Sequence, residues 1–215
     1  MSPSVDFNLY LITDRKQLPP GRSLVETVAA ALEGGVRAVQ LREKDLSAAE
    51  LYPLALDLRE LTARHGARLQ LNDRLDVALA VEADGVHLGG HSLPVAVARK
   101  ILGPDQLISV STHSTEEVIA AQGAGADFVT FGPVFFTPSK AAYGEPVGLD
   151  RLRETCAAST LPVFALGGVS SDHISEIRNA GCHRAALISA ILSAADPAAA
   201  ATSLLALLSH SAGTL

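Results

Sequence analysis

Eight short, mostly apolar segments, each followed by a segment with helix-forming character, recur along the whole chain and constrain its fold more than any other feature. The predicted strands are residues 9–13, 38–42, 68–71, 85–88, 107–111, 128–131, 162–166 and 184–188. The predicted helices occupy about residues 23–35, 47–66, 76–81, 93–102, 114–123, 149–158, 172–179 and 197–208. Continuous apolar strands that alternate with helices are typical of a parallel sheet covered by helices.

Eight strand-helix units predict a single (β/α)8 TIM barrel that spans residues 1–215. The alternative is an open doubly wound sheet, but the number of units and the lack of a G-x-G-x-x-G after the first strand disfavour it. A chain of 215 residues can bury one good core and is near the lower size limit of such a barrel. We therefore expect one domain, with residues 209–215 frayed at its end.

Composition excludes several classes of protein. The net charge of -6 argues against a non-specific nucleic-acid binder, whose affinity comes from Lys and Arg. No uninterrupted apolar run approaches the length of a membrane span, and residues 1–6 lack the regions of a signal peptide. Cys156 and Cys182 show no metal-type spacing, so we expect reduced core thiols. These features predict a cytoplasmic protein without nucleic-acid or membrane partners.

A long connection follows the predicted strand that ends at Phe131. It carries Thr137, Ser139 and Lys140 together with prolines that stiffen the backbone, and the next helix signal begins only near Gly148. A loop of this length inside a compact domain is usually a lid or a binding loop. Two hydroxyls and a lysine at the end of a buried strand suit a phosphate or a diphosphate. An ordinary surface loop with a solvated lysine is the alternative.

A barrel gathers the C-terminal ends of its strands at one mouth, where active sites of this fold lie. The residues expected there are Arg42, Glu43, Lys44, Asn72, Asp73, His87, His91, Ser92, Ser111, His113, Thr137, Ser139, Lys140, Gly167, Gly168, Ile188 and Ser189. The cations among them can neutralise a diphosphate. Asp73 could hold Mg2+, since hard cations prefer oxygen ligands. Backbone N–H groups near Gly168 and Ser189 can bind a phosphate.

Each of these residues also has a structural interpretation. Arg42 and Glu43 could form an ion pair at the mouth. Asp73 could cap the following helix, and Gly167-Gly168 could be a tight turn without a ligand. His87 is more readily explained as a hydrogen-bonded interior histidine than as a catalytic group. The residue types alone leave these alternatives open.

Five segments, spread over almost the whole chain and in the right order, resemble the thiamine phosphate synthase and thiazole tautomerase (TenI-like) superfamily. They are residues 40–46 (QLREKDL), 71–74 (LNDR), 83–89 (ADGVHLG), 131–140 (FGPVFFTPSK) and 165–169 (ALGGV). The synthases join 4-amino-2-methyl-5-(hydroxymethyl)pyrimidine diphosphate to 4-methyl-5-(β-hydroxyethyl)thiazole phosphate. Diphosphate leaves, and the thiazole nitrogen traps a pyrimidine-methyl cation. The resemblance therefore implies a transferase of thiamine biosynthesis that binds small phosphorylated substrates.

The resemblance also implies a role for each matching residue. Arg42, Lys44, Asn72 and Lys140 would bind the pyrimidine diphosphate, Asp73 would ligate Mg2+, and Ser111 would line the reacting centre. Thr137, Ser139, Gly168, Ile188 and Ser189 would hold the thiazole phosphate. A homodimer is compatible with the family and is not decided by the sequence.

One segment departs from the synthase pattern. Residues 90–92 are Gly-His-Ser, where the synthases carry a second acidic metal ligand at the position of Ser92. This loop looks more like the tautomerases, yet Pro133 stands where those enzymes carry their catalytic histidine. In a tautomerase, His91 or His113 would have to shuttle the proton. The complete pyrimidine-diphosphate set favours a synthase; a tautomerase and a non-catalytic thiazole-phosphate binder are the alternatives.

Overall fold

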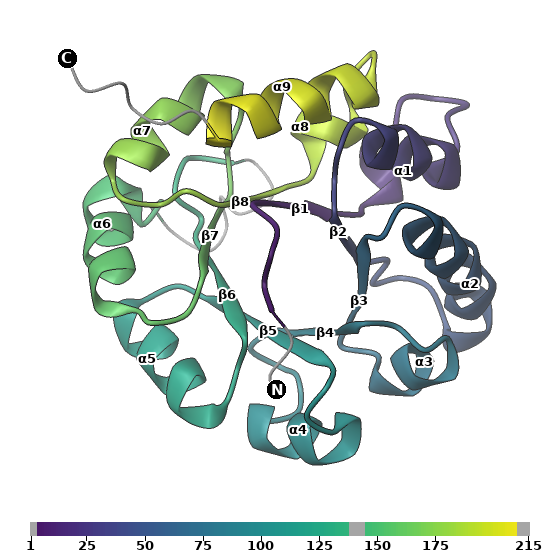
Figure 1. Cartoon of the computed structure of the whole chain (residues 1–215), viewed down its shortest axis with the longest axis horizontal. Helices are drawn as coiled ribbons and strands as arrows, with labels where there is room; N and C mark the ends of the chain where they lie inside the picture. Colours follow the sequence, from purple (N-terminus) through teal and green to yellow (C-terminus); the bar gives the residue numbers. More distant parts are fainter. Residues whose placement is uncertain (1–3, 138–144, 210–215) are drawn as a thin grey trace.

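Eight parallel strands close into a barrel in chain order, and β8 pairs with β1 (Figure 1). The computed structural model describes residues 4–137 and 145–209. The strands are β1 (Leu9–Ile12), β2 (Ala38–Leu41), β3 (Arg68–Asn72), β4 (Gly85–Leu88), β5 (Leu107–Thr112), β6 (Phe128–Phe131), β7 (Val163–Leu166) and β8 (Ala185–Leu187). The predicted (β/α)8 barrel is confirmed, and all eight predicted strands are present within one or two residues of their expected bounds.

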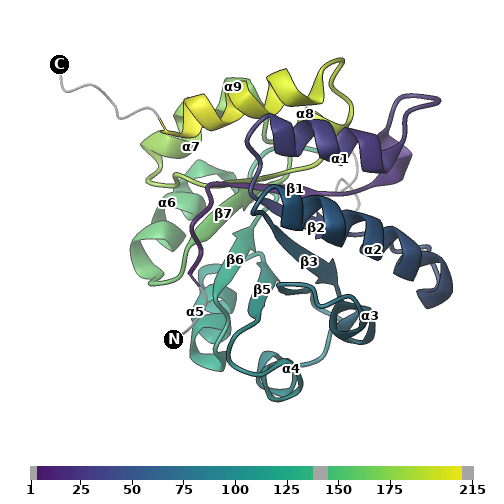
Figure 2. The ribbon, with the colours of Figure 1, turned by 45° about the vertical axis from the view of Figure 1, so that its right-hand side comes forward.

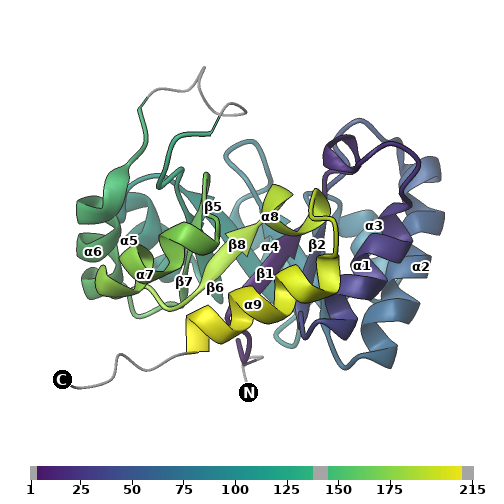
Figure 3. The same ribbon diagram turned by 90° about the horizontal axis from the view of Figure 1, so that it is seen from above.

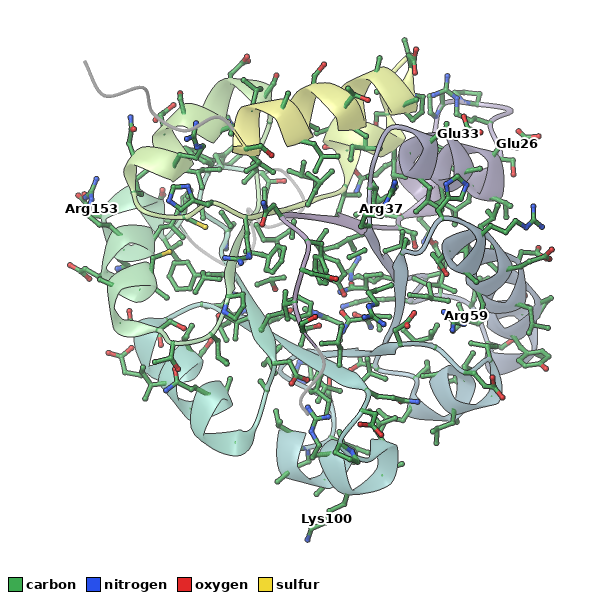
Figure 4. The ribbon with its side chains drawn as sticks, in the orientation of Figure 1. Glu26, Glu33, Arg37, Arg59, Lys100 and Arg153 are labelled. Atoms are coloured by element: carbon green, nitrogen blue, oxygen red, sulfur yellow. The ribbon has the colours of Figure 1, made fainter. Side chains whose placement is uncertain are left out.

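The helices form a ring around the barrel, and α9 returns beside α1 (Figures 1 and 2). They are α1 (Leu24–Glu33), α2 (Ala48–Arg64), α3 (Leu75–Ala80), α4 (Val95–Leu102), α5 (Thr115–Ala124), α6 (Gly148–Ala158), α7 (Ile174–Asn179), α8 (Ser189–Leu192) and α9 (Pro197–Ser209). Lys100 of α4 and Arg153 of α6 point away from the barrel (Figure 4). The short helices α8, η1 (Arg15–Gln17) and η3 (Ser171–His173) are too brief to leave a periodic sequence signal.

Local signals explain where the longer helices begin. The Ser47 hydroxyl accepts from the Glu50 N–H while the Glu50 carboxylate accepts from the Ser47 N–H, which completes a capping box at α2. Ser23 caps α1 by accepting from the Glu26 N–H. At the other end of the chain, α9 extends to Ser209, so the expected fraying of residues 209–215 stays a prediction. Residues 210–215 lie outside the described residues.

Two clusters of buried apolar side chains stabilise the barrel. The larger one packs the outer faces of the strands against the helices, with Leu11, Val39 and Ile108 among its buried members. The smaller one fills the barrel interior near the N-terminal ends of the strands. There Phe7, just before β1, packs against the rings of Phe128 and Phe164, with ring centroids 5.5 and 5.4 Å away. These rings close the N-terminal end of the barrel interior, so side chains inside the barrel can meet a ligand only at the other end.

Within the described residues, we find no helix with the length and apolarity that crossing a bilayer requires. Cys182 is buried, Cys156 is half-buried, and both are free thiols, in agreement with the expectation from their spacing.

We predict that Gly85→Ala strongly destabilises the barrel. A Cβ atom at Gly85 would lie 2.0 Å from the Leu107 carbonyl oxygen on the neighbouring strand. Relieving that clash must move β4 away from β5, which should lower the free energy of unfolding by about 3 kcal/mol. Urea denaturation measures the effect.

Gly123→Ala is the matched control. Gly123 lies in α5, and a Cβ atom there would meet nothing within 4 Å. Alanine is the better helix former, so stability should rise by about 0.5–1 kcal/mol. Equal stability of the two variants would contradict the packing argument.

Candidate active site

The loops that leave the C-terminal ends of the strands rise along one edge of the barrel (Figure 3). Side chains on one face of a strand repeat every two residues, so a residue two positions beyond an interior one also points inward. Gln40, Gln70 and Ser109 are buried inside the barrel. The residues two positions further on, at the mouth, are Arg42, Asn72 and Ser111. The structure therefore brings together three of the predicted site residues.

A buried carboxylate organises the first two loops of the mouth. Glu43 accepts hydrogen bonds from the Thr13 hydroxyl at 2.7 Å, from the Arg15 N–H at 3.1 Å and from the Arg15 guanidinium at 3.0 Å. Thr13 in turn accepts from the Arg42 backbone N–H at 2.9 Å. The alternative of an Arg42–Glu43 ion pair is wrong, because Glu43 pairs with Arg15. Glu43 thus fixes the backbone that carries Arg42.

Asp45 lies beside Glu43 at the end of β2 and also pairs with cations. It pairs with Arg15 at 2.8 Å and with Lys16 at 3.0 Å. Hydrogen bonds from Arg15 and then from Lys16 hold the pKa of Asp45 at about 2. Glu43 and Asp45 are therefore already neutralised by cations from the β1–α1 loop.

Arg42 and Lys44 keep their charge free for a ligand. In residues 4–137 and 145–209, neither side chain enters an ion pair, and both line a shallow hollow with Asp14 and Lys16. Arg42 is half-buried and Lys44 is exposed. Cations fixed beside the barrel mouth without a protein partner suit a multiply charged anion.

Asn72, Asp73 and Ser92 form the opposite wall of the mouth. The Asn72 amide donates to Asp73 Oδ2 at 3.0 Å, and the Ser92 hydroxyl donates to Asp73 Oδ1. Ser92 also accepts from the Gly89 N–H at 2.5 Å. Asp73 adopts a left-handed backbone with φ 62°, and Arg74 rather than Asp73 is the N-cap of α3. The helix-cap explanation of Asp73 is therefore wrong.

The Asp73–Ser92 pair offers a hard cation two adjacent oxygen ligands at the mouth. A carboxylate beside a hydroxyl is the protein ligand set that holds Mg2+ in P-loop enzymes, where phosphate oxygens and water complete the shell. The described residues hold no group of three His, Cys, Asp or Glu side chains that could form a metal site by itself. The residues fit Mg2+ only if a phosphorylated ligand supplies further oxygens.

A chain of hydrogen bonds crosses the barrel interior below Ser111. Gln40 Nε2 donates to the Tyr10 hydroxyl at 3.1 Å, and the Tyr10 hydroxyl donates to Gln70 Oε1. The Ser109 hydroxyl donates to the same oxygen at 2.9 Å. Gln70 Nε2 donates to the Leu107 carbonyl at 3.5 Å, which sets the orientation of the amide. Ser109 has thereby committed its single proton to Gln70.

His87 continues this chain to the mouth. Its Nδ1 lies 2.7 Å from the Ser109 hydroxyl and its Nε2 lies 2.8 Å from the Ser111 hydroxyl. Because the Ser109 proton goes to Gln70, His87 Nδ1 must donate to Ser109 and Nε2 must accept from Ser111. Burial lowers the pKa of His87 to about 3, so the ring is neutral and has one N–H to donate. Ser111 therefore turns its proton inward and its lone pairs toward the mouth.

The loop that follows β6 (the β6 loop) starts in contact with the turn that follows β7. Gly167 and Gly168 have φ values of 91° and 67°, and a Cβ atom on Gly168 would lie 2.6 Å from the Phe136 carbonyl oxygen. The Phe135 N–H donates to the Gly167 carbonyl at 3.0 Å. Only glycine permits both the left-handed backbone and this close approach. The glycine pair thus has a packing role, whether or not it also binds phosphate.

The remaining predicted residues lie around this turn or beyond the described chain. Thr137 is half-buried at the end of the described β6 loop, while Ser139 and Lys140 lie outside the described residues. Ile188 precedes α8, and Ser189 is the exposed first residue of that helix. The roles of these residues stay predictions.

The two histidines considered for proton transfer occupy different positions. His113 Nδ1 lies 2.5 Å from the Gly132 carbonyl oxygen and so must donate to it. That bond holds the ring against the start of the β6 loop. His91 is exposed in the β4–α4 connection. The sequence alone did not assign a role to Thr13, Arg15, Gln70 or Ser109. For the interior Gln70 and Ser109 a signal exists, because each lies two positions before a predicted site residue, Asn72 or Ser111.

The chain is similar to known proteins along almost its whole length. The sequence profile described as thiamine monophosphate synthase matches residues 9–191. A putative thiamine-phosphate synthase of Geobacter sulfurreducens is 58% identical over 204 residues, which cover 95% of each chain. The thiamine-phosphate synthase of Moorella thermoacetica is 46% identical over 195 residues, or 91% of this chain and 92% of that one.

A solved structure extends the agreement to three dimensions. Thiamine phosphate pyrophosphorylase from Pyrococcus furiosus superposes with a TM-score of 0.84 at 38% identity, covering 94% of this chain and 95% of that one. The profile match and these identities extend over nearly the whole barrel. The chain therefore belongs to the thiamine monophosphate synthase family.

Proposed function

We propose that this protein is a thiamine phosphate synthase, a transferase that couples the pyrimidine diphosphate and the thiazole phosphate to give thiamine phosphate and diphosphate. The observation that carries the proposal is that Arg42 and Lys44, which share the barrel mouth with Asn72 and Asp73, enter no ion pair among the residues that the structure describes. Relatives at 43–58% identity over most of the chain carry the same enzyme name.

The reaction needs little acid-base chemistry and much charge stabilisation. The bond between the pyrimidine methylene carbon and the diphosphate oxygen breaks, and negative charge builds up on the leaving group. Arg42 and Lys44 would neutralise that charge, and Asn72 would donate from its amide. Each charge-assisted hydrogen bond contributes about 1.5–3 kcal/mol, most effectively where the donors are already in place. Lys140 stays a predicted further cation on the diphosphate.

Ser111 would act on the other product of bond cleavage, the pyrimidine-methyl cation. Its proton is committed to His87, so its oxygen can only accept from the substrate. The exocyclic amino group of the pyrimidine is the matching donor. As positive charge spreads into the ring, that N–H becomes a stronger donor, and the hydrogen bond strengthens in the transition state. Neutral His87 holds the serine in this orientation.

Asp73 and Ser92 would hold Mg2+ against the diphosphate. The bound ion would supply charge neutralisation to the leaving group. Before it can ligate, Ser92 must turn its proton away from Asp73 Oδ1. Since the pair carries one carboxylate, the free protein should bind the cation weakly and the diphosphate should supply the missing negative charge.

The thiazole phosphate is assigned to the opposite rim. Gly168, Ile188 and Ser189 present backbone N–H groups near the β7 and β8 ends, and Thr137 and Ser139 carry hydroxyls. A cytoplasmic location and a homodimer also stay predictions. Cell fractionation and light scattering on the purified protein test them.

Incubation of the purified protein with both substrates and Mg2+ should give thiamine phosphate and diphosphate over many turnovers. Ser111→Ala should lower kcat by about 100-fold, because the cation loses its preorganised acceptor. His91→Ala and His113→Ala should stay within about twofold of the wild type, since this reaction needs no proton shuttle. Absence of thiamine phosphate, or isomerisation of thiazole phosphate carboxylate at a rate lost in either histidine variant, would favour a tautomerase instead.

Glu43→Gln should weaken pyrophosphate binding about tenfold by loosening the backbone that positions Arg42. Isothermal titration calorimetry measures the affinity, and circular dichroism checks the fold. Glu60→Gln is the matched control, because Glu60 pairs with Arg64 on the exposed face of α2. If both variants bind pyrophosphate like the wild type, Glu43 does not position Arg42.

Ser92→Asp should raise the affinity of the free protein for Mg2+ by about tenfold or more, since a second carboxylate joins Asp73. Ser92→Ala should leave weak binding of the free protein unchanged and reduce Mg2+ binding in the presence of pyrophosphate. Calorimetric titration with Mg2+, with and without pyrophosphate, measures both. Tight binding of Mg2+ to the free wild-type protein would contradict the one-carboxylate site.

A further inference from the structure

Two thiols lie together at the closed end of the barrel, away from the candidate active site. Cys156 is half-buried in the last turn of α6, and Cys182 is buried between α7 and β8. Both line one shallow hollow, which also includes Pro162, His183 and Arg184. Val163 and Ala185 are the first residues of β7 and β8, so the hollow lies at the N-terminal ends of these strands.

The two sulfurs interact directly. The hydrogen bond between them, more than any other cause, lowers the pKa of the Cys182 thiol and raises the pKa of the Cys156 thiol. Cys182 is therefore the stronger acid of the two thiols. The Cys182 thiol also lies 3.2 Å from the Val163 and Arg184 carbonyl oxygens.

A cation lies beside Cys182. Arg184 contributes to the lowered pKa of Cys182 through its positive charge. Its Nε is one of the buried side-chain atoms that have no hydrogen-bond partner among the described residues. A thiolate next to a cation is the reactive form of cysteine.

We propose that Cys156 and Cys182 are a dithiol site that closes reversibly to a disulfide by exchange with a small disulfide oxidant such as oxidised glutathione. Cys156 is the entry thiol because it is the one that reaches solvent. Cys182, the stronger acid, first releases its proton to water or buffer. The Cys156 proton then passes to the Cys182 sulfur as the Cys156 sulfur attacks the oxidant, and one glutathione thiolate leaves.

The second step closes the bond within the protein. The departing glutathione thiolate takes the proton from Cys182, and the Cys182 sulfur attacks the Cys156 sulfur of the mixed disulfide. The second glutathione leaves as a thiolate and takes a proton from water or buffer. The protein thiols have then lost two protons and two electrons, and the oxidant has become two molecules of reduced glutathione.

The bond would link the end of α6 to the entry of β8 around the segment that contains β7, the Gly167-Gly168 turn and α7. A cross-link over a loop of this length restricts the unfolded chain. The melting temperature should rise by about 5–10 °C in the oxidised protein.

To test the proposal, the full-length protein is equilibrated in a glutathione redox buffer and the reaction is quenched with acid. Free thiols are then alkylated, and mass spectrometry measures the intact protein and its tryptic peptides. The expected product has lost two hydrogens, contains a Cys156–Cys182 cross-linked peptide, and returns to two alkylatable thiols with dithiothreitol. Wild-type protein that keeps both thiols alkylatable in oxidising buffer overturns the proposal. So does a mixed disulfide on Cys156 that never closes.

Two variants separate the steps. Cys182→Ser should stop at the mixed disulfide on Cys156, and Cys156→Ser should stay unmodified because its remaining thiol is buried. Rapid glutathionylation of Cys182 in the Cys156→Ser variant would overturn the assigned order. If Cys182→Ser does not fold, the peptide map of the wild-type protein still tests whether the disulfide forms. The Cys156→Ser variant then tests whether Cys156 is the entry thiol.

Discussion

The chain of hydrogen bonds inside the barrel is the constraint on which the candidate site depends. It joins Gln40, Tyr10, Gln70, Ser109, His87 and Ser111, which come from five strands. An unsatisfied polar group in such an interior costs about 1–3 kcal/mol, so each member must keep its partner. Because each hydroxyl has one proton to give, the direction of one bond dictates the next. The chemistry of Ser111 at the mouth is therefore decided by groups that never meet a substrate.

The charged residues at the mouth are likewise determined by the partners that they already have. Glu43 and Asp45 would attract Arg42 and Lys44 if they were free, but Arg15 and Lys16 from the β1–α1 loop already pair with them. Arg42 and Lys44, which follow β2, are therefore available to bind an anionic ligand. Such donors need little reorganisation when an anion arrives, which is the condition under which they stabilise developing charge best.

The two ends of the barrel serve different purposes. Aromatic rings led by Phe7 close the N-terminal end, and the paired thiols lie at the periphery of that end. Loops, free cations and the Asp73–Ser92 pair occupy the C-terminal end. A change at one end, including oxidation of the thiols, can alter stability without touching a group that would contact a substrate.

The sequence by itself determined the fold and the residues of the mouth. Eight apolar runs define eight strands, and the residues that follow them must gather at one end of a parallel barrel. The sequence could not reveal which partner each polar group takes. Arg42 is next to Glu43 in the chain, but neighbours on a strand point to opposite faces, and Arg15 of the adjoining loop takes the carboxylate.

Only the tertiary structure decided the roles that depend on several strands at once. His87 was recognisable as an interior histidine, but its proton is placed by the register of β3, β4 and β5, which aligns Gln70, Ser109 and Ser111 around it. Cys156 and Cys182 became a pair through the packing of α6 against the entry to β8. Periodicity is a local property of the chain, whereas pairing across a barrel depends on how distant segments align, and no short stretch of sequence encodes that alignment.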